Sequence, residues 1–397
     1  MPFLIFCSHD PAFEDDDRQQ YPVIILLILF LLPPILPHRS TDVVGQEVQP
    51  PEHQNDARSH DQIEPADMEE KWNSGWAFYL DNDIVAERDG GDYTGGFAIS
   101  LSGKRAKEWF FSLDPILGFL NDVTGFSSLD TGSRTLRRHS FEFGTTAFTP
   151  EDITREDPIF DDQPYAGLVF LNNVRRTTNL DDDITYLSSF TLGVLGTGIV
   201  PEIQEITHDI TGSDDPMGWE HQISDGGEPT FKYTLLRQDL LYTQREGGFS
   251  DFDLKSTFGG SVGYITQVQG GISWRFGRLS TPAWKFSPDF GEYVNLGSPV
   301  DREVGDDPFP QELFLWGGLN ARLRGYNAFL EGQFRDSTVT FDRSELHPLI
   351  GEANFGITCG FQTGTRVSIG VRARTEELNN ARGNRTVWGT LMLSQAY

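Results

Sequence analysis

One histidine and a small group of oxygen-bearing side chains have the residue types that hydrolytic chemistry needs. His208 lies in residues 201–222, PEIQEITHDITGSDDPMGWEHQ. Asn82 and Asp83 lie in residues 76–91, WAFYLDNDIVAERDGG, and Thr94 follows in the next segment, GDYTGG. A neutral imidazole can activate water, and oxygen ligands suit a hard cation such as calcium, which polarises an ester carbonyl. We therefore interpret these segments together as a candidate hydrolytic site.

Each segment taken alone has an ordinary structural explanation. An Asn-Asp pair at the end of a strand is usually a turn former, and an acidic run such as SDDP is usually a solvated loop. A histidine on the polar side of a short surface helix is usually exposed and without function. Only the joint occurrence of these residues in one chain favours the hydrolytic interpretation.

Residues 201–222 contain the one convincing helical pattern in the chain. Pro201 suits the start of the helix and Gly212 suits its end. Three isoleucines fall on one side of the helical wheel, namely Ile203, Ile206 and Ile210. Gln204 and His208 fall on the other side. We expect the isoleucines to pack against the protein and the imidazole to point elsewhere.

Most of the remaining sequence alternates with a period of two residues, which is typical of strands. Aromatic residues lie near the ends of segments about ten residues long, and Gly, Asp, Asn and Pro separate them. Thirteen such segments are predicted: 76–85, 93–102, 139–148, 165–176, 186–195, 231–242, 254–264, 267–276, 312–323, 325–333, 349–361, 366–374 and 386–397. The pattern favours an all-β, antiparallel transmembrane β-barrel over a soluble β-sandwich or a water-soluble barrel. Because single-chain barrels of this kind have even strand numbers, we expect one of the thirteen segments to be wrong and the strand count to be twelve or fourteen.

The hairpin formed by the first two segments is expected to bring Thr94 toward Asp83. Residues 1–38 are interpreted as a signal segment, because the apolar run at 21–36 is shorter than the roughly 20 residues of a spanning helix and is broken by two prolines. Residues 39–72 are interpreted as a flexible acidic leader, and residues 73–397 as the barrel domain.

Composition excludes some functions. The formal net charge of −28 argues against a nucleic-acid partner, because phosphate neutralisation needs a basic surface. Cys7 and Cys359 form neither a disulfide framework nor a zinc-ligand pattern.

The order of the motifs resembles that of the outer-membrane lipid A 3′-O-deacylase family, over about residues 76–397. The specificity of the resemblance lies in the ordered set. The matching residues are Asn82-Asp83, Asp92-Tyr93-Thr94-Gly95-Gly96, Phe148-Thr149-Pro150, and His208 with Ile210, Gly212, Trp219 and Gln222.

The resemblance implies a twelve-stranded barrel with a short helix in an extracellular loop, and an esterase acting on lipid A or lipopolysaccharide in the outer membrane. It implies that His208 is the base and that Asn82, Asp83 and Thr94 are catalytic residues that also bind calcium. Asp214 falls at a further metal position. Arg155 falls where the family has a substrate-binding lysine, which keeps the charge but changes its geometry.

Two other functions fit the same strand pattern. A passive outer-membrane barrel, either a channel or a structural protein, needs no polar set on its first two strands. A secreted lipid-binding β protein needs no site at a barrel rim. The sequence does not indicate which acyl chain is removed, the role of His221, or the oligomeric state.

Overall fold

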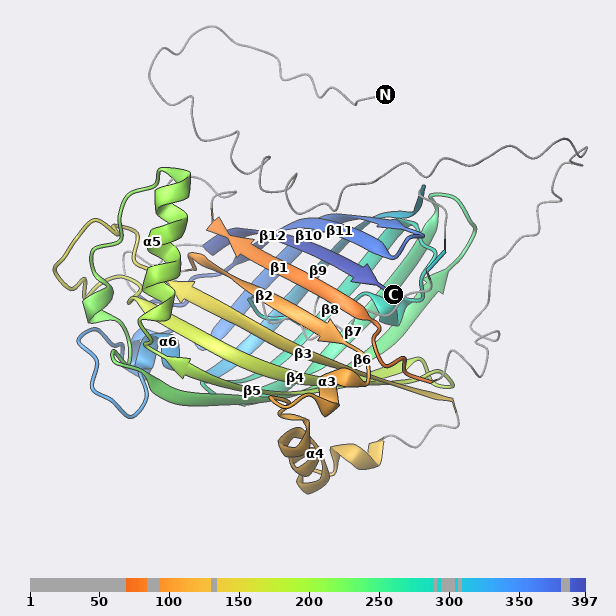
Figure 1. Ribbon diagram of the computed structural model, residues 1–397, viewed down its shortest axis with the longest axis horizontal. Coiled ribbons are helices and arrows are strands. Elements are labelled where there is room, and N and C mark those ends of the chain that lie inside the picture. Colours follow the sequence, from red (N-terminus) through yellow and green to blue (C-terminus); the bar gives the residue numbers. More distant parts are fainter. Residues whose placement is uncertain are drawn as a thin grey trace, which may run out of the picture.

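The computed structural model describes residues 69–83, 93–129, 134–288, 291–293, 304–305, 309–379 and 386–397. Twelve antiparallel strands form a closed barrel in which β1 pairs with both β2 and β12 (Figure 1). The strands are β1 Gly75–Asn82, β2 Gly95–Ser102, β3 Thr135–Phe148, β4 Ala166–Asn179, β5 Ile184–Leu195, β6 Glu228–Gln244, β7 Asp251–Gly263, β8 Ile265–Arg278, β9 Pro310–Asn327, β10 Leu349–Phe361, β11 Thr365–Arg374 and β12 Thr386–Ala396. The predicted fold class is confirmed, and residues 1–68 lie outside the described part.

The alternation of side chains is inverted relative to a water-soluble barrel. On β10, Phe355 and Ile357 point outward and are exposed, whereas Glu352, Asn354 and Thr358 point inward and are buried. An apolar outer wall around a polar interior is typical of a barrel that lies in lipid.

One of the thirteen predicted strands is wrong. Residues 325–333 do not form a separate strand, because β9 continues to Asn327 and the chain then enters the short helix α6, Ala328–Glu331. The Asn327 side chain accepts a hydrogen bond from the backbone N–H of Phe329 and so starts this helix. Hydrophobic alternation does not reveal such a local cap.

The connections divide between two ends of the barrel. The terminal end, where Gly75 pairs with Ala396, carries α3 Arg105–Glu108, α4 Asp114–Val123, η3 Phe126–Leu129 and η5 Ala283–Lys285. The loop end carries α5 Ile199–Thr211, η4 Trp219–His221, α6 and η7 Arg343–Glu345. Within the described ranges, no helix combines the length and the apolar character that crossing a membrane requires.

Residues 69–72, the last of the predicted leader, are held against the barrel. The Glu70 carboxylate accepts a hydrogen bond from the backbone N–H of His139 at 2.6 Å and lies 2.8 Å from its Nδ1. Both side chains are buried. This contact fixes the chain immediately before β1.

A network of ion pairs fills part of the barrel interior. The Glu352 carboxylate lies 2.9 Å from Arg322, 2.9 Å from Arg374 and 3.5 Å from Arg372. Glu292, in the connection between β8 and β9, pairs with Arg324 and Arg374. These side chains are almost completely buried, so each charge depends on its partners.

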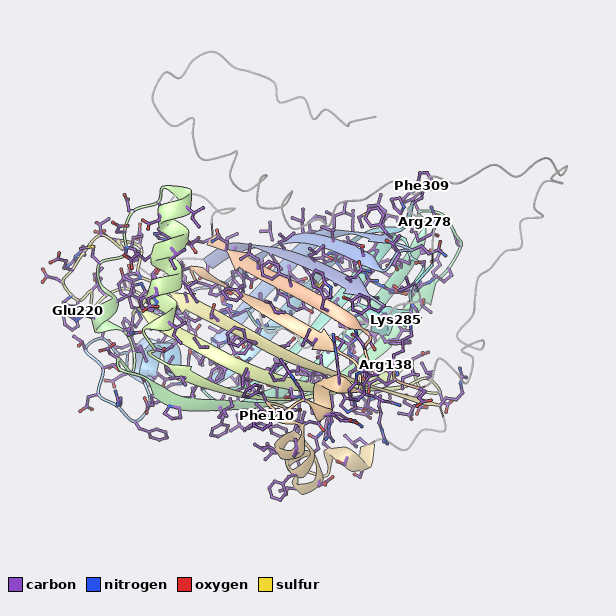
Figure 2. The ribbon with its side chains drawn as sticks, in the orientation of Figure 1. Phe110, Arg138, Glu220, Arg278, Lys285 and Phe309 are labelled. Atoms are coloured by element: carbon purple, nitrogen blue, oxygen red, sulfur yellow. The ribbon has the colours of Figure 1, made fainter. Side chains whose placement is uncertain are left out.

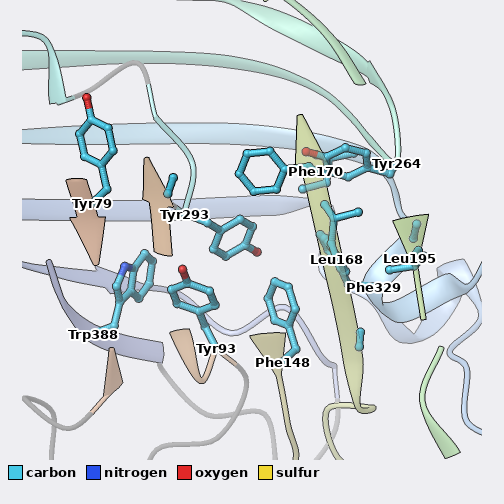
Figure 3. Packing of buried hydrophobic residues seen from close by; sticks show 14 of the residues in the cluster. Tyr79, Tyr93, Phe148, Leu168, Phe170, Leu195, Tyr264, Tyr293, Phe329 and Trp388 are labelled. Atoms are coloured by element: carbon cyan, nitrogen blue, oxygen red, sulfur yellow. The ribbon is translucent and has the colours of Figure 1, made fainter. Parts of the chain in front are cut away.

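An aromatic cluster crosses the interior nearer the loop end (Figure 3). Tyr93 packs on Tyr293 with ring centroids 4.7 Å apart, and on Trp388 at 5.1 Å. Phe148, at the end of β3, packs on Tyr93 at 5.4 Å and on Phe329 of α6 at 4.4 Å. The rings therefore connect opposite walls and support the loops from inside.

The interior ion pairs allow a test of the fold. Glu352→Gln should lower the free energy of unfolding by about 3–5 kcal/mol, because it leaves three buried guanidinium groups with one carboxylate fewer. The matched control is Glu220→Gln, whose side chain is 73% exposed beside His221 and whose loss should cost less than about 1 kcal/mol. Urea unfolding followed by heat-modifiable gel mobility measures both. Equal effects of the two substitutions would contradict the structural role of Glu352.

Candidate active site

The first two strands bring the polar residues of the first motifs together. Asn82, the last residue of β1, pairs with Gly95 of β2. The backbone N–H of Asp83 donates to the carbonyl oxygen of Thr94 at 3.4 Å, so Asp83 and Thr94 are neighbours, as the hairpin predicts. Gly95 has φ +143°, and a Cβ there would lie 2.5 Å from the Asp81 carbonyl oxygen. Only glycine fits this close approach.

Thr94 is also tied to the third strand. Its hydroxyl lies 2.6 Å from the hydroxyl of Thr149, directly after β3, and its N–H donates to the Ala147 carbonyl at 3.2 Å. The segment Phe148-Thr149-Pro150 thus serves two purposes: Phe148 joins the interior aromatic cluster and Thr149 holds Thr94. Asp92 of the same motif lies outside the described residues.

A buried carboxylate supports these strands from inside the barrel. Asp81 accepts hydrogen bonds from the Tyr93 hydroxyl at 3.2 Å, the Trp388 indole at 3.2 Å and the Thr390 hydroxyl at 2.8 Å. Because Tyr93 directly precedes Thr94, this network fixes where β2 begins. The sequence places Asp81 beside Asn82 but does not indicate this role.

Helix α5 lies at the loop end beside the wall formed by β3 and β4 (Figure 1). It ends at Gly212, which has φ 72°, as predicted. The predicted packing of the isoleucines is wrong, because Ile206 and Ile210 are 59% and 55% exposed. Val200 and Gln204 are the buried side chains of the helix, since their partners lie on the barrel side.

The ring of His208 is held in one tautomer. Its Nδ1 lies 2.5 Å from the backbone carbonyl oxygen of Asp214, which can only accept a hydrogen bond. Nδ1 therefore carries the proton in the neutral ring, and Nε2 keeps its lone pair. An imidazole in this state can accept a proton from water.

Gln204 and Trp219 extend this arrangement. The Trp219 indole donates to Oε1 of Gln204 at 2.8 Å, which turns the Gln204 amide nitrogen toward Nε2 of His208, at 3.4 Å. Trp219 packs on Tyr165 and Val200 in a buried cluster. Our sequence prediction did not include Gln204 in the site, although its spacing of four residues from His208 places both on one helical face.

Asp83 has an electrostatic environment that differs from that of an exposed carboxylate. Burial raises the pKa of the Asp83 carboxyl to about 6 from its ordinary value of 3.8. A backbone hydrogen bond and the charge of His208 lower this pKa and offset part of the rise. The interaction with His208 indicates that the imidazole lies within electrostatic reach of this carboxylate.

The donors near Asp83 fit a hard cation in their chemistry. Asn82, Asp83 and Thr94 offer an amide, a carboxylate and a hydroxyl oxygen, which are ligands that calcium accepts. Within the described ranges, no three His, Cys, Asp or Glu side chains are grouped to hold a metal, so such a site would depend on neutral oxygens. Asp214 is exposed and reaches His208 through its main-chain carbonyl. Its predicted role as a ligand stays a prediction.

Two further residues lie on the rim beside α5. Arg155 is exposed in the β3–β4 connection, and its carbonyl oxygen lies 3.2 Å from the position of a Cβ on Gly218. His221, to which the sequence assigned no role, lies 3.0 Å through Nε2 from the Glu156 carbonyl. Arg155 thus belongs to the loop that packs on residues 217–221, and its guanidinium faces solvent.

The family described as "Outer membrane protein LpxR" matches residues 56–397. No curated protein matches the sequence. Among solved structures, LpxR from Salmonella typhimurium shares 15% sequence identity with a TM-score of 0.62, covering 82% of this chain and 100% of that chain. The β domain of the Bordetella autotransporter BrkA shares 9% identity with a TM-score of 0.37, over 82% of this chain and 100% of its own. The first likeness establishes a shared fold.

The raised pKa of Asp83 makes stability depend on pH. A folded-state pKa near 6 means that stability contributed by the protonated carboxyl is full below about pH 3.8 and is lost as the pH rises through 6. In excess chelator at neutral pH, Asp83→Asn should therefore raise the free energy of unfolding by up to about 3 kcal/mol, since each pH unit between the two pKa values is worth about 1.4 kcal/mol.

Urea unfolding between pH 4 and pH 8 measures this effect. Asp214→Asn is the control, because it removes a carboxylate at an exposed position of the same site. Identical profiles for Asp83→Asn and the unmodified chain would show that Asp83 does not titrate in this range.

Proposed function

The chain belongs to the family of the outer-membrane protein LpxR, and on this premise we propose that it hydrolyses an ester-linked acyl chain of lipid A. The protein lies in the outer membrane as a closed barrel of twelve strands. In this proposal the loop end, which carries α5 and the candidate site, faces outward, as the resemblance implies for the helix that contains His208. The candidate site then lies at the level of the outer leaflet, where lipopolysaccharide is found.

The observation that carries this proposal is the state of His208. Its Nδ1 is bound to the Asp214 carbonyl, which leaves the lone pair of the neutral ring on Nε2, where it can accept a proton, and the ring lies within electrostatic reach of the half-buried carboxylate of Asp83. This is the arrangement of a general base beside an electrophile-binding group. A purely structural histidine does not need a neighbouring carboxylate with a raised pKa.

In the proposed reaction, His208 Nε2 removes a proton from a water molecule while the water oxygen attacks the ester carbonyl carbon. The carbonyl of Asp214 stabilises the resulting imidazolium through Nδ1–H. When the tetrahedral intermediate collapses, the C–O bond to the sugar breaks and Nε2 returns the proton to the leaving oxygen. The products are a free fatty acid and a sugar hydroxyl, so water is the only other reactant.

Asn82, Asp83 and Thr94 would hold a calcium ion, which when bound supplies positive charge to the developing oxyanion. The contribution of the chain itself is to hold these three side chains in place. The pairing of β1 with β2 fixes Asn82 and Asp83, and Thr149 holds the Thr94 hydroxyl. Because these contacts lie at the ends of paired strands, they form before substrate arrives.

Features around the site suit an anionic glycolipid. Arg155 exposes a guanidinium on the adjacent loop, where a phosphate of the headgroup would find a charged donor. Ile206 and Ile210 expose apolar surface on the outer side of α5, where an acyl chain would lie. The site thus offers a polar end and an apolar side to one ligand.

An open channel is disfavoured by the filled interior. The aromatic cluster connects Trp388 and Phe148 with Phe329 of α6, which follows the opposite strand β9, and buried ion pairs occupy the space around Glu352. Neither feature is typical of a water-filled pore.

The role of His208 can be tested directly. His208→Ala should reduce release of fatty acid from lipid A by about 10²-fold or more, as loss of a general base usually does. His221→Ala is the matched control, because this histidine lies in the same loop and its contacts are to the Glu156 carbonyl and Glu220 in the described part of the chain. Mass spectrometry of lipid A from cells expressing each variant measures the loss of a whole acyl mass. Both proteins should keep heat-modifiable mobility, and full turnover by folded His208→Ala would exclude it as the base.

The cation has a separate test. Activity should disappear in excess chelator and return with calcium, and Asp83→Ala should raise the calcium concentration needed for half-maximal activity as well as lower turnover. Asp214→Ala should keep its calcium midpoint if only its carbonyl is used. Full activity in excess chelator, combined with inactive Asp83→Ala, would instead make Asp83 an orienting partner of His208.

A further inference from the structure

The segment of residues 105–123, which contains α3 and α4, lies on the outside of the barrel, away from the candidate site (Figure 1). Leu113 and Leu117 of this segment pack on Phe190 of β5 and Tyr233 of β6. The next outward positions on these strands, Leu192 and Phe231, are 43% and 49% exposed. Helix α4 therefore covers a part of the wall that adjoins exposed apolar wall.

The contacts under α4 are specific and polar. Arg175 of β4 donates to the Asp114 carboxylate through Nε at 2.7 Å and through a terminal nitrogen at 2.6 Å. The backbone N–H of Leu113 donates to Oδ1 of Asn173 at 2.7 Å. Asn121 donates to the Ser188 hydroxyl at 2.8 Å and accepts from the Tyr233 hydroxyl at 2.8 Å.

These polar groups belong to the outer wall. Asn173 and Arg175 have the opposite orientation to Asn172, whose side chain points inward and bonds to the buried Glu142 and Thr191. Without α3 and α4, an amide, a guanidinium and a hydroxyl would point at the lipid around the barrel, where unpaired polar groups cost several kcal/mol. The segment forms hydrogen bonds with these polar side chains and covers them, so that its own outer face takes their place on the surface of the barrel.

That other face is apolar. Six large side chains of the segment are exposed by 45–88%, namely Trp109, Phe110, Phe111, Ile116, Phe119 and Val123. Figure 2 shows Phe110 at the lower edge of the barrel, outside the strands and beside the segment that contains α3 and α4. An exposed apolar patch of this size, continuous with the lipid-facing wall, calls for an apolar neighbour.

Basic residues border this face at the terminal end. Lys104, Arg105 and Lys107 precede the aromatic run in the sequence KRAKEWFF. Arg105 donates to the Gly75 carbonyl at 2.9 Å, at the start of β1, which places the basic group where the barrel leaves the membrane. Basic residues followed by aromatic and aliphatic residues are typical of helices that lie in a membrane interface.

We propose that α3 and α4 form a lipid-embedded anchor, which binds the acyl chains and headgroups of periplasmic-leaflet phospholipids and replaces a polar part of the barrel wall with an apolar one. The periplasmic leaflet follows from the position of the segment at the terminal end, opposite the candidate site. A water-facing position would leave six large apolar side chains exposed, in a chain whose formal charge of −28 otherwise favours a solvated surface.

A spin label on α4 tests the proposal independently of enzymatic activity. Cys7 and Cys359 are replaced by serine in the full chain, which is reconstituted in vesicles of phosphatidylethanolamine and phosphatidylglycerol. A nitroxide is then attached to Phe119→Cys. Matched labels at Phe258→Cys, 66% exposed on the β7 wall, and at Asp182→Cys, exposed in the β4–β5 turn, give the lipid and water references.

Collisions of the residue-119 label with a water-soluble nickel complex should be about tenfold rarer than at residue 182, because lipid excludes the polar complex. A tenfold ratio corresponds to about 1.4 kcal/mol. Collisions with oxygen should match those at residue 258. Nickel accessibility equal to that at residue 182 would overturn the proposal, since the face would lie in water. Low accessibility to both reagents would also overturn it, because a second copy or another protein would then cover the face. A label at Val123→Cys, 68% exposed one turn later, gives the same comparison from a second variant.

Discussion

The structure depends on the closure of the backbone ladder around the barrel. Strand β1 pairs with β12 over its whole length, so every strand has two neighbours and no edge is left unpaired. In lipid an unpaired edge would be very costly, and closure is the arrangement that removes it. Closure also turns polar side chains into the barrel interior, so buried charges such as Glu352 must be paired there. Aromatic rings fill the remaining space by packing across it. The candidate site uses this rigidity at one rim.

Two helices expose large apolar side chains, which a water-soluble protein would bury. Helix α5 turns Gln204 and His208 toward the protein and exposes Ile206 and Ile210. Helix α4 likewise turns Asn121 toward the wall and exposes Phe119. In both helices polar side chains have partners within the protein, on the wall for Asn121 and in the β5–β6 loop for Gln204 and His208, so large apolar side chains face outward. An apolar environment around the barrel would therefore account for the orientation of both helices.

Sequence reasoning predicted the barrel because period-two alternation is a local property of each strand. It also predicted the approach of Asp83 and Thr94, because a hairpin relates residues that are close in sequence. It did not predict the direction of α5, since a helical wheel separates two faces without saying which one meets lipid. The bond from Trp219 to Gln204 spans fifteen residues and a loop, so no spacing rule reveals it. The strand predicted at 325–333 failed because the cap at Asn327 depends on one side-chain contact.

Asp81 and Asp83, two positions apart, have different surroundings. Asp81 accepts from Tyr93, Trp388 and Thr390, so its oxygens are engaged by neutral donors that hold β1, β2 and β12 together. Asp83 lies one position beyond the strand, and the influences that lower its pKa are a backbone hydrogen bond and the charge of His208. A carboxylate that is half-buried and incompletely compensated gains more from a cation than one that is fully hydrogen-bonded. Strand β1 ends at Asn82, so Asp81 is held inside the barrel by the network, whereas Asp83 lies beyond the strand and is the carboxylate that we propose as the cation ligand.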